Sequence, residues 1–171
     1  PMSVIIMERM IVQGCEKFII IGGAGSLVHT LDVTHLVIPT SAIRDEGVSY
    51  HYLPPSREVN ADDEGVAMIE KVLHQRDLPY HKSKTWTTDA IFRETESKRD
   101  ARIGEGCSVV EMEAAAFFAV AKFRGVQAAQ LLCAGDLVVP EGWDKRGWDS
   151  HPEIRRKMFE IGVDVIREWT K

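Results

Sequence analysis

The stretch Val109-Val110-Glu111-Met112-Glu113-Ala114-Ala115-Ala116 places two carboxylates on either side of a methionine, where an apolar run becomes alanine-rich. Valines favour an extended backbone and alanines are strong helix formers, so the sequence predicts a strand ending at Glu111 and a helix over 114–123. Side chains two residues apart in an extended segment point to the same side. Both carboxylates and Met112 can therefore border one crevice at a strand-to-helix junction, where α/β domains usually bind ligands.

The same residues also admit a purely structural interpretation. A negative charge such as Glu113 favours a helix N-terminus because it complements the helix dipole, and Met112 can fill the core. For two carboxylates in isolation this interpretation is the commoner one. The choice between it and a ligand site depends on the rest of the chain.

Short apolar runs alternate with helical segments along the chain. Runs such as Phe18-Ile19-Ile20-Ile21 are typical of strands that are covered on both faces. Asn60 is the expected N-cap of one helix, and Ser150 with Glu153 has capping-box spacing at another. We expect strands near 18–21, 36–38, 80–87, 109–111 and 128–134, and helices over 2–13, 62–75, 114–123 and 152–169. This alternation predicts an α/β fold.

The composition limits the size of the protein and its partners. The chain has 171 residues, 44% hydrophobic and 27% charged, so we expect residues 1–171 to form a single domain with one core. The net charge of -5 argues against a nucleic-acid partner, because duplex binding depends on clustered Lys and Arg. The densest basic group, Arg155-Arg156-Lys157, lies in an amphipathic segment where we expect a solvated face.

Cysteine and histidine usage indicates a cytoplasmic protein without a metal. Cys15, Cys107 and Cys133 are widely spaced in apolar surroundings, as free thiols in a reducing compartment are. The six histidines show no metal-ligand spacing. No apolar run is long enough to cross a bilayer and the start lacks a signal pattern, so we expect neither a membrane protein nor a secreted one.

Three further segments complete a pattern with Glu111-Met112-Glu113. A glycine-rich segment, Ile20-Ile21-Gly22-Gly23-Ala24-Gly25-Ser26-Leu27, lies upstream, and Gly135-Asp136 ends a predicted strand downstream. Between them lie Arg44-Asp45-Glu46-Gly47-Val48-Ser49-Tyr50-His51-Tyr52 and Thr87-Thr88-Asp89-Ala90-Ile91-Phe92. In this order and spacing, the segments resemble the nucleoside phosphorylase family, which includes purine nucleoside and uridine phosphorylases.

The resemblance implies a three-layer fold, with a mixed central sheet flanked by helices and without the family's N-terminal portion. It also implies phosphorolysis of a ribonucleoside to free base and ribose 1-phosphate, with inorganic phosphate as co-substrate and no cofactor or metal. The ribose site would contain Glu113, which accepts hydrogen bonds from hydroxyls, Met112 and Glu111. Gly23, Ala24 and Gly25 would hold phosphate, Ile91, Phe92 and Arg93 would contact the base, and a protonated Asp136 would donate to a base nitrogen as the catalytic acid. A turn cap is the structural alternative for Asp136.

Two positions depart from the family pattern. A phosphate-binding arginine of the family corresponds to Ile20, and a common hydroxyl residue corresponds to Gly23. Three functions therefore stay open: a nucleoside phosphorylase, a hydrolytic nucleosidase, and a catalytically silent assembly subunit. Asp136 resembles the purine branch and the segment 44–52 the uridine branch, so the sequence favours a purine base only slightly.

Two aromatic segments each have two interpretations. The loop after Asp136 contains Gly-Trp-Asp twice and is either a lid or a segment that its tryptophans fix to the surface. The run Tyr50-His51-Tyr52 is either folded back on its own domain or part of an interface. Since the family forms dimers or rings of dimers, the resemblance implies a homodimer or a higher homo-oligomer.

Overall fold

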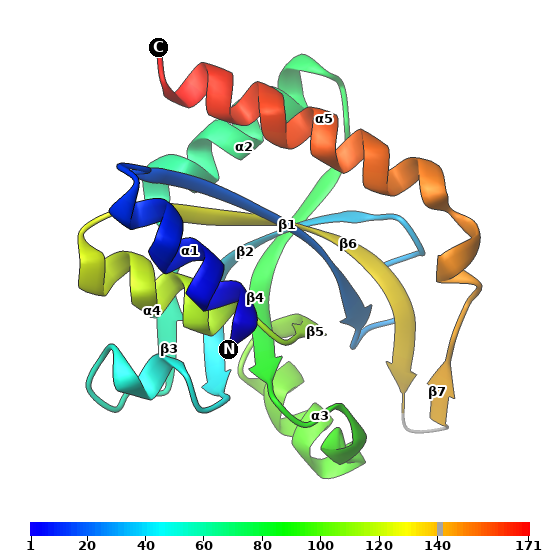
Figure 1. Ribbon diagram of the computed structural model, residues 1–171. Helices are drawn as coiled ribbons and strands as arrows, with labels where there is room; N and C mark the ends of the chain where they lie inside the picture. The colour runs from blue at the N-terminus through cyan, green and yellow to red at the C-terminus, as the bar shows by residue number, and fades with distance from the viewer. Residues whose placement is uncertain (140–141) are drawn as a thin grey trace.

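The computed structural model describes residues 1–139 and 142–171 (Figure 1). Short 3-10 turns at Ser49–His51, Ile91–Arg93 and Trp148–Ser150 connect the longer elements. These are α1 (Met2–Val12), β1 (Lys17–Ser26), β2 (Leu36–Asp45), β3 (Glu58–Asn60), α2 (Asp63–Gln75), β4 (Tyr80–Thr88), α3 (Glu96–Gly104), β5 (Cys107–Glu111), α4 (Ala114–Arg124), β6 (Gln127–Val139), β7 (Gly142–Asp144) and α5 (Pro152–Trp169).

One mixed sheet contains the strands, in the order β3-β2-β4-β5-β1-β6-β7. The pairs β1–β6, β2–β4 and β4–β5 are parallel, and β1–β5, β2–β3 and β6–β7 are antiparallel. An additional antiparallel pairing joins β2 to β6, so five strands form a closed ring. The predicted α/β fold with a mixed central sheet and flanking helices is confirmed, whereas the closure was not visible in the sequence.

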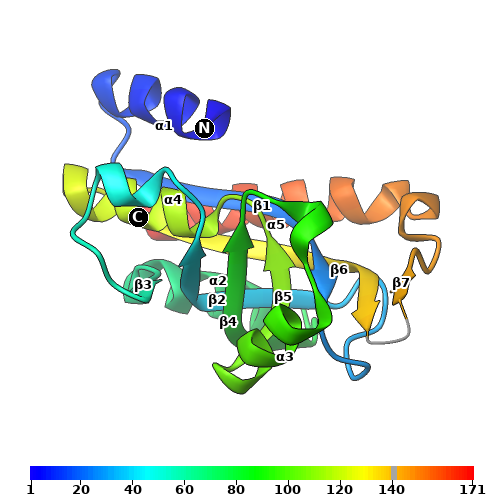
Figure 2. The same ribbon diagram turned by 90° about the horizontal axis from the view of Figure 1, so that it is seen from below.

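The helices cover the sheet in separate groups. Figure 1 shows α2 and α5 together along one side of the sheet, and α3 beyond the far end of β4. In Figure 2, α1 lies outermost and α4 lies between it and the strands. This arrangement leaves the ends of β1, β5 and β6 bordered by α5 and by the segment that precedes α3.

Small residues determine how closely two helices approach the sheet. The alanines at 114, 115 and 119 of α4 are fully buried, and the helix ends at Gly125, whose φ of 68° suits glycine. In α2, a Cβ added to Gly65 would lie 2.5 Å from Cη2 of Trp169 and 2.8 Å from Cβ of Ala129. Only glycine fits this three-way contact between α2, β6 and α5.

Several local expectations were wrong. The strand expected near 18–21 is longer, because β1 continues through Gly22–Gly25 to Ser26 with a bulge between Ala24 and Ser26. The cap of α2 is Asp62, whose carboxylate accepts from the Gly65 N–H at 2.8 Å, and Asn60 ends β3. No side chain caps α5, since Ser150 belongs to a 3-10 turn. Helix α3 was not expected.

The aromatic run Tyr50-His51-Tyr52 folds back on its own chain. The buried Arg44 donates to the carbonyls of Leu53 and Pro54, and its guanidinium lies 4.1 Å from the centre of the Tyr50 ring. The Tyr50 hydroxyl donates to the Arg44 carbonyl at 2.9 Å, while Tyr52 packs edge-on against Phe123. These contacts agree with the intramolecular interpretation of the run, although Tyr50 is still partly exposed.

Candidate active site

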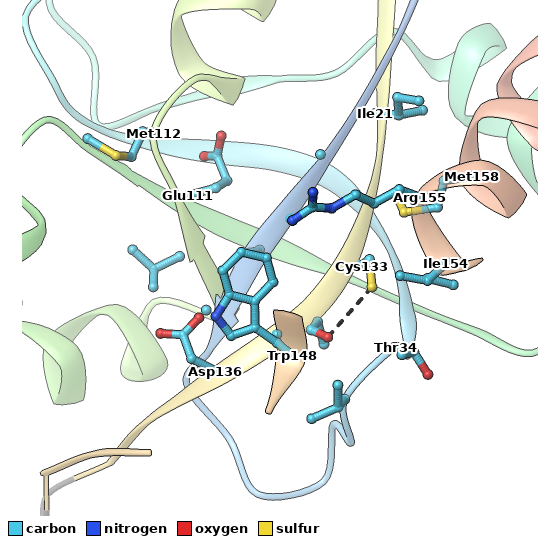
Figure 3. Close-up of a pocket in the computed structure, with 18 of the residues that line it drawn as sticks. Ile21, Thr34, Glu111, Met112, Cys133, Asp136, Trp148, Ile154, Arg155 and Met158 are labelled. Atoms are coloured by element: carbon cyan, nitrogen blue, oxygen red, sulfur yellow. Dashed lines mark hydrogen bonds between the residues drawn. The ribbon is translucent and has the colours of Figure 1, made fainter. Parts of the chain in front are cut away.

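A cavity of about 590 Å³ lies at the ends of β1, β5 and β6. Its walls come from the glycines of β1, the Glu111–Glu113 junction, the end of β6, the segment before α3, and the first turns of α5. Figure 3 shows Glu111 and Met112 on one side and Cys133, Ile154 and Met158 on the other, with Asp136 and Trp148 below Glu111 in this view. Segments that are distant in sequence therefore meet where the strand-to-helix junction predicted a crevice.

Glu111 is a buried residue whose carboxylate is fully occupied by protein donors. Its Oε1 accepts from the Thr87 hydroxyl at 2.6 Å. Its Oε2 accepts from the N–H groups of Glu113 at 2.7 Å and Ala114 at 2.6 Å, so Glu111 caps α4 from inside the fold. Burial raises the pKa of Glu111 to about 7, and these hydrogen bonds oppose a further rise.

Glu111 is expected to make stability depend on pH near neutrality. Its folded-state pKa is about 7 against an ordinary 4.5, so the native protein holds more protons than the unfolded chain between these values. The stabilisation by the protonated carboxyl is complete below pH 4.5 and is lost as pH rises toward 7. We expect the unfolding free energy of the wild type to fall by about 2 kcal/mol more than that of Glu111→Gln between pH 5 and pH 7. Urea denaturation at both pH values measures the difference, and equal slopes would contradict this role.

Glu113 occupies the N-cap position of α4, but its side chain makes no capping hydrogen bond. Its side chain is exposed and lines the cavity, and its own N–H and that of Ala114 already donate to Glu111. Met112 is 42% exposed and lines the same wall. The capping task therefore falls to Glu111, which leaves the Glu113 carboxylate available to a ligand.

Asp136 lies where β6 passes the cavity, and a tryptophan of β7 donates to its carboxylate. The Trp143 indole N–H donates to Asp136 Oδ2, and a Cβ added to Gly25 would lie 3.5 Å from the same oxygen. Arg146 anchors the loop by donating to the carbonyls of Gly135 and Leu31. Asp136 is thus oriented by the first Gly-Trp-Asp unit rather than acting as a turn cap.

The glycine segment of β1 gives the cavity an open backbone wall. Gly23, Ala24 and Gly25 all line the cavity, and a Cβ added to Gly23 would meet nothing within 4 Å. The strand therefore leaves space for a ligand directly against its backbone. Ile20 does not line the cavity, so this wall carries no charge of its own.

Arg155 brings a positive charge to the cavity, while Arg155, Arg156 and Lys157 are all exposed, as the expected solvated face requires. It projects from α5 toward β1 (Figure 3), and its guanidinium lies 5.5 Å from the centre of the Trp148 ring. Within the described part of the chain, it is the basic side chain among the lining residues. The helical periodicity of the sequence could not predict that Arg155 lines the cavity. Arg155 lies near the start of α5, and the position of this helix over the sheet determines what its side chains contact.

The segment predicted to contact the base enters the cavity only in part. Ile91 lines it, whereas Phe92 is 98% exposed and neither Phe92 nor Arg93 belongs to the lining. The next residue, Glu94, lines the cavity and was missed. Burial, with a smaller contribution from the charge of Asp136, raises the pKa of Glu94 to about 7.

Other kinds of site receive no support from the described residues. Residues 1–139 and 142–171 contain no group of three or more His, Cys, Asp or Glu side chains that could hold a metal ion. Burial raises the pKa of the Cys133 thiol, which lines the cavity, to about 11, so it is not a ready nucleophile. In the same described ranges, no helix is both long and apolar enough to cross a membrane.

The family follows from a comparison of the sequence with protein families. The model described as "Phosphorylase superfamily" matches residues 1–160, so the chain belongs to this superfamily. The resemblance to nucleoside phosphorylases is thereby confirmed. Phosphorylases of this family use inorganic phosphate as co-substrate.

Two curated relatives carry nucleoside phosphorylase names. The chain is 27% identical over 167 residues to a guanosine phosphorylase of Halorubrum lacusprofundi, covering 98% of this chain and 68% of the relative. It is 24% identical over 186 residues to a uridine phosphorylase of Thermococcus kodakarensis, covering 99% of this chain and 64% of the relative. The chain thus spans about two thirds of the length of these relatives.

Two solved structures share the fold. A Plasmodium knowlesi homologue of the P. falciparum PNP aligns with a TM-score of 0.79 at 21% identity, covering 97% of this chain and 67% of that one. An AMP nucleosidase from Bacteroides thetaiotaomicron aligns with a TM-score of 0.73 at 20% identity, covering 89% of this chain and 60% of that one. At these identities the likeness concerns the fold alone.

Proposed function

We propose that the cavity binds a ribonucleoside and that the protein catalyses its phosphorolysis to free base and ribose 1-phosphate. The observation that carries the proposal is the meeting of Glu113, Asp136 and the open Gly23 wall around one cavity. Cleavage of a nucleoside develops positive charge on the sugar and negative charge on the departing base. An anionic group near the ribose, an acid beside the base and space for an anion are what this reaction needs.

Each residue at the sugar and the base has its own role in the proposed reaction. Glu113 accepts hydrogen bonds from the ribose hydroxyls, Met112 packs against the sugar, and Glu111 fixes the start of α4 and thus the position of Glu113. Asp136 in its protonated form donates to a base nitrogen as the glycosidic bond breaks. The base lies between Asp136 and Ile91, and Trp148 closes one side of the cavity.

Phosphate lies against the backbone of Gly23, Ala24 and Gly25. The absence of a side chain at Gly23 permits an anion to approach the strand, as close backbone approach requires. Arg155 supplies the positive charge that Ile20 does not, because its side chain reaches from α5 toward β1. This arrangement keeps the attacking anion on the ribose side of the cavity.

The proposal is tested by incubating the protein with guanosine, inosine, adenosine and uridine, with and without phosphate. We expect base release that requires phosphate, and an Arg155→Gln variant whose KM for phosphate rises about tenfold while its KM for nucleoside changes less. Arg156→Gln is the matched control. Arg156 is the next residue along α5 and forms an exposed ion pair with Glu160, so this variant should resemble the wild type.

Two other outcomes would replace the proposal. Release of base at the same rate without phosphate would identify a hydrolytic nucleosidase, the alternative that Ile20 favours because the strand itself offers phosphate no cation. Absence of release with every nucleoside would indicate a silent subunit. A purine is the slightly favoured base, and the guanosine phosphorylase relative supports this choice.

A further inference from the structure

Thr87 is a fully buried polar residue of β4 that has no role in the reaction as proposed above. It is the register partner of Glu111 in the parallel pair β4–β5. Its hydroxyl makes two hydrogen bonds, because it donates to Glu111 Oε1 at 2.6 Å and accepts from the Ala115 N–H at 3.0 Å. One hydroxyl group therefore joins β4 both to the end of β5 and to the first turn of α4.

The chemistry of the groups determines the direction of these two bonds. The Ala115 amide can only donate, so the Thr87 hydroxyl accepts from it and keeps its own proton for Glu111. An oxygen-to-oxygen distance of 2.6 Å is typical of a hydroxyl that donates to an ionised carboxylate. Thr85, on the same face of β4, is a weaker donor, because its hydroxyl lies 3.4 Å from the same Glu111 oxygen. Thr87 is therefore the stronger of the two side-chain links between β4 and Glu111.

The start of α4 depends on side chains from both strands. The N–H groups of Glu113 and Ala114 donate to Glu111 on β5, and that of Ala115 donates to Thr87 on β4. N–H groups at a helix start have no partner within the helix, so the groups that cap them determine where the first turn lies. Glu113 immediately precedes this turn as the N-cap residue. Its place beside the cavity therefore depends on Thr87 as well as on Glu111.

The backbone that follows Thr87 leads to the opposite side of the cavity. The Thr88 hydroxyl accepts from the Ala90 N–H at 3.2 Å, and the next residue, Ile91, lines the cavity. In the proposed function, Ile91 contacts the base and Glu113 contacts the ribose. Thr87 thus connects the two sides, through the backbone to Ile91 and through hydrogen bonds to the turn beside Glu113.

We infer that Thr87 is a positioning residue, whose hydroxyl holds Glu113 in the place relative to the base side of the cavity that nucleoside cleavage requires. The inference rests on the proposed function, because it takes Glu113 as the ribose contact. Thr87 does not line the cavity, so it acts through Glu111 and the start of α4. Displacing a substrate-positioning group by about 1 Å can cost on the order of 100-fold in rate.

The test compares nucleoside cleavage by the wild type, Thr87→Val and Thr87→Ser. Valine keeps the shape of threonine but removes the hydroxyl, so we expect kcat to fall by about 10- to 100-fold. The KM for phosphate should change by less than about threefold, because Gly23 and Arg155 belong to elements that Thr87 does not contact. Serine keeps the hydroxyl, so Thr87→Ser should recover kcat to within about threefold of the wild type.

Thr85→Val is the matched control. Thr85 is as fully buried as Thr87 and lies on the same strand, but the two hydrogen bonds of its hydroxyl are both 3.4 Å long. Its variant loses a buried hydroxyl without losing the link to Ala115, so kcat should stay within about threefold of the wild type. An equal loss of kcat in Thr85→Val and Thr87→Val would contradict the positioning role.

Hydrogen exchange at the start of α4 gives a second readout that does not need turnover. In Thr87→Val the Ala115 amide loses its acceptor, so it should exchange at least about tenfold faster than in the wild type, while the amides of β1 and β6 keep their protection. This result supports the positioning of α4 even if the wild type releases no base, in which case only the proposed reaction fails. Unchanged exchange at Ala115, faster exchange throughout the sheet, or an unchanged kcat in Thr87→Val of an active parent would overturn the inference.

Discussion

Replacing Glu113 with glutamine is expected to lower kcat/KM by about 100- to 1,000-fold, or roughly 3–4 kcal/mol of transition-state stabilisation, while leaving the fold intact. Glutamine keeps the shape of the side chain but removes the negative charge that faces the developing positive charge on the ribose. The fold should not respond, because the exposed Glu113 side chain caps nothing and Glu111 satisfies the first N–H groups of α4.

The Glu113 prediction is measured with the best nucleoside under saturating phosphate, together with urea denaturation. Glu16→Gln is the control, since Glu16 is exposed just before β1 begins, at the end of that strand remote from the cavity. An active parent whose Glu113→Gln variant keeps its kcat/KM would exclude the ribose role. A variant that loses stability as well as activity would indicate a structural contribution instead.

Gly65→Ala is expected to destabilise the protein by about 3 kcal/mol. Alanine is intrinsically better than glycine in a helix by up to about 1 kcal/mol. Here that gain is outweighed, because the new Cβ would lie 2.5 Å from the Trp169 ring and 2.8 Å from Cβ of Ala129. Trp169 and Ala129 are both buried, so α2, α5 or β6 must shift to make room, and overpacking of a core costs about 1–3 kcal/mol or occasionally more.

Gly104→Ala is the control for Gly65→Ala. Gly104 ends α3, and a Cβ added there would meet nothing within 4 Å, so its replacement should be neutral or slightly stabilising. Urea denaturation gives the free energies, and thermal unfolding should show Gly65→Ala lowered by roughly 6–12 °C. Wild-type stability of Gly65→Ala would mean that the three elements are not packed as closely as described.

Much of the fold could be predicted because its signals are local. The apolar runs at 18–21 and 109–111 and the helices at 114–123 and 152–169 all became elements of the expected kind. The β2–β6 pairing could not be predicted, because register between distant strands leaves no periodic signal in either of them. Helix α3 was missed since its mean hydropathy is low and its two buried residues, Arg99 and Arg102, are charged.

Sequence reasoning could find cavity-lining residues that belong to a local backbone pattern, such as Glu113 and Asp136. It could not be predicted where tertiary structure decides the role. Arg155 and Glu94 enter the cavity only because α5 and the segment before α3 lie against the ends of the strands. Glu111 looked equivalent to Glu113, yet the sheet buries the one and leaves the other exposed. The roles of all these residues, the single-domain organisation and the homo-oligomer stay predictions.

The closed ring of strands also determines when the site can exist during synthesis. Residues of β2, near the start of the chain, pair with residues of β6, near its end, and β1 has its long parallel ladder with β6 as well. Contacts between such distant segments carry a high loop-closure cost and tend to form late. In a chain emerging from the ribosome, β3, β4 and β5 are available to β1 and β2 early, but β6 is missing until it has left the exit tunnel. The cavity, whose floor needs β1 and β6 side by side, is among the last features of the molecule to form.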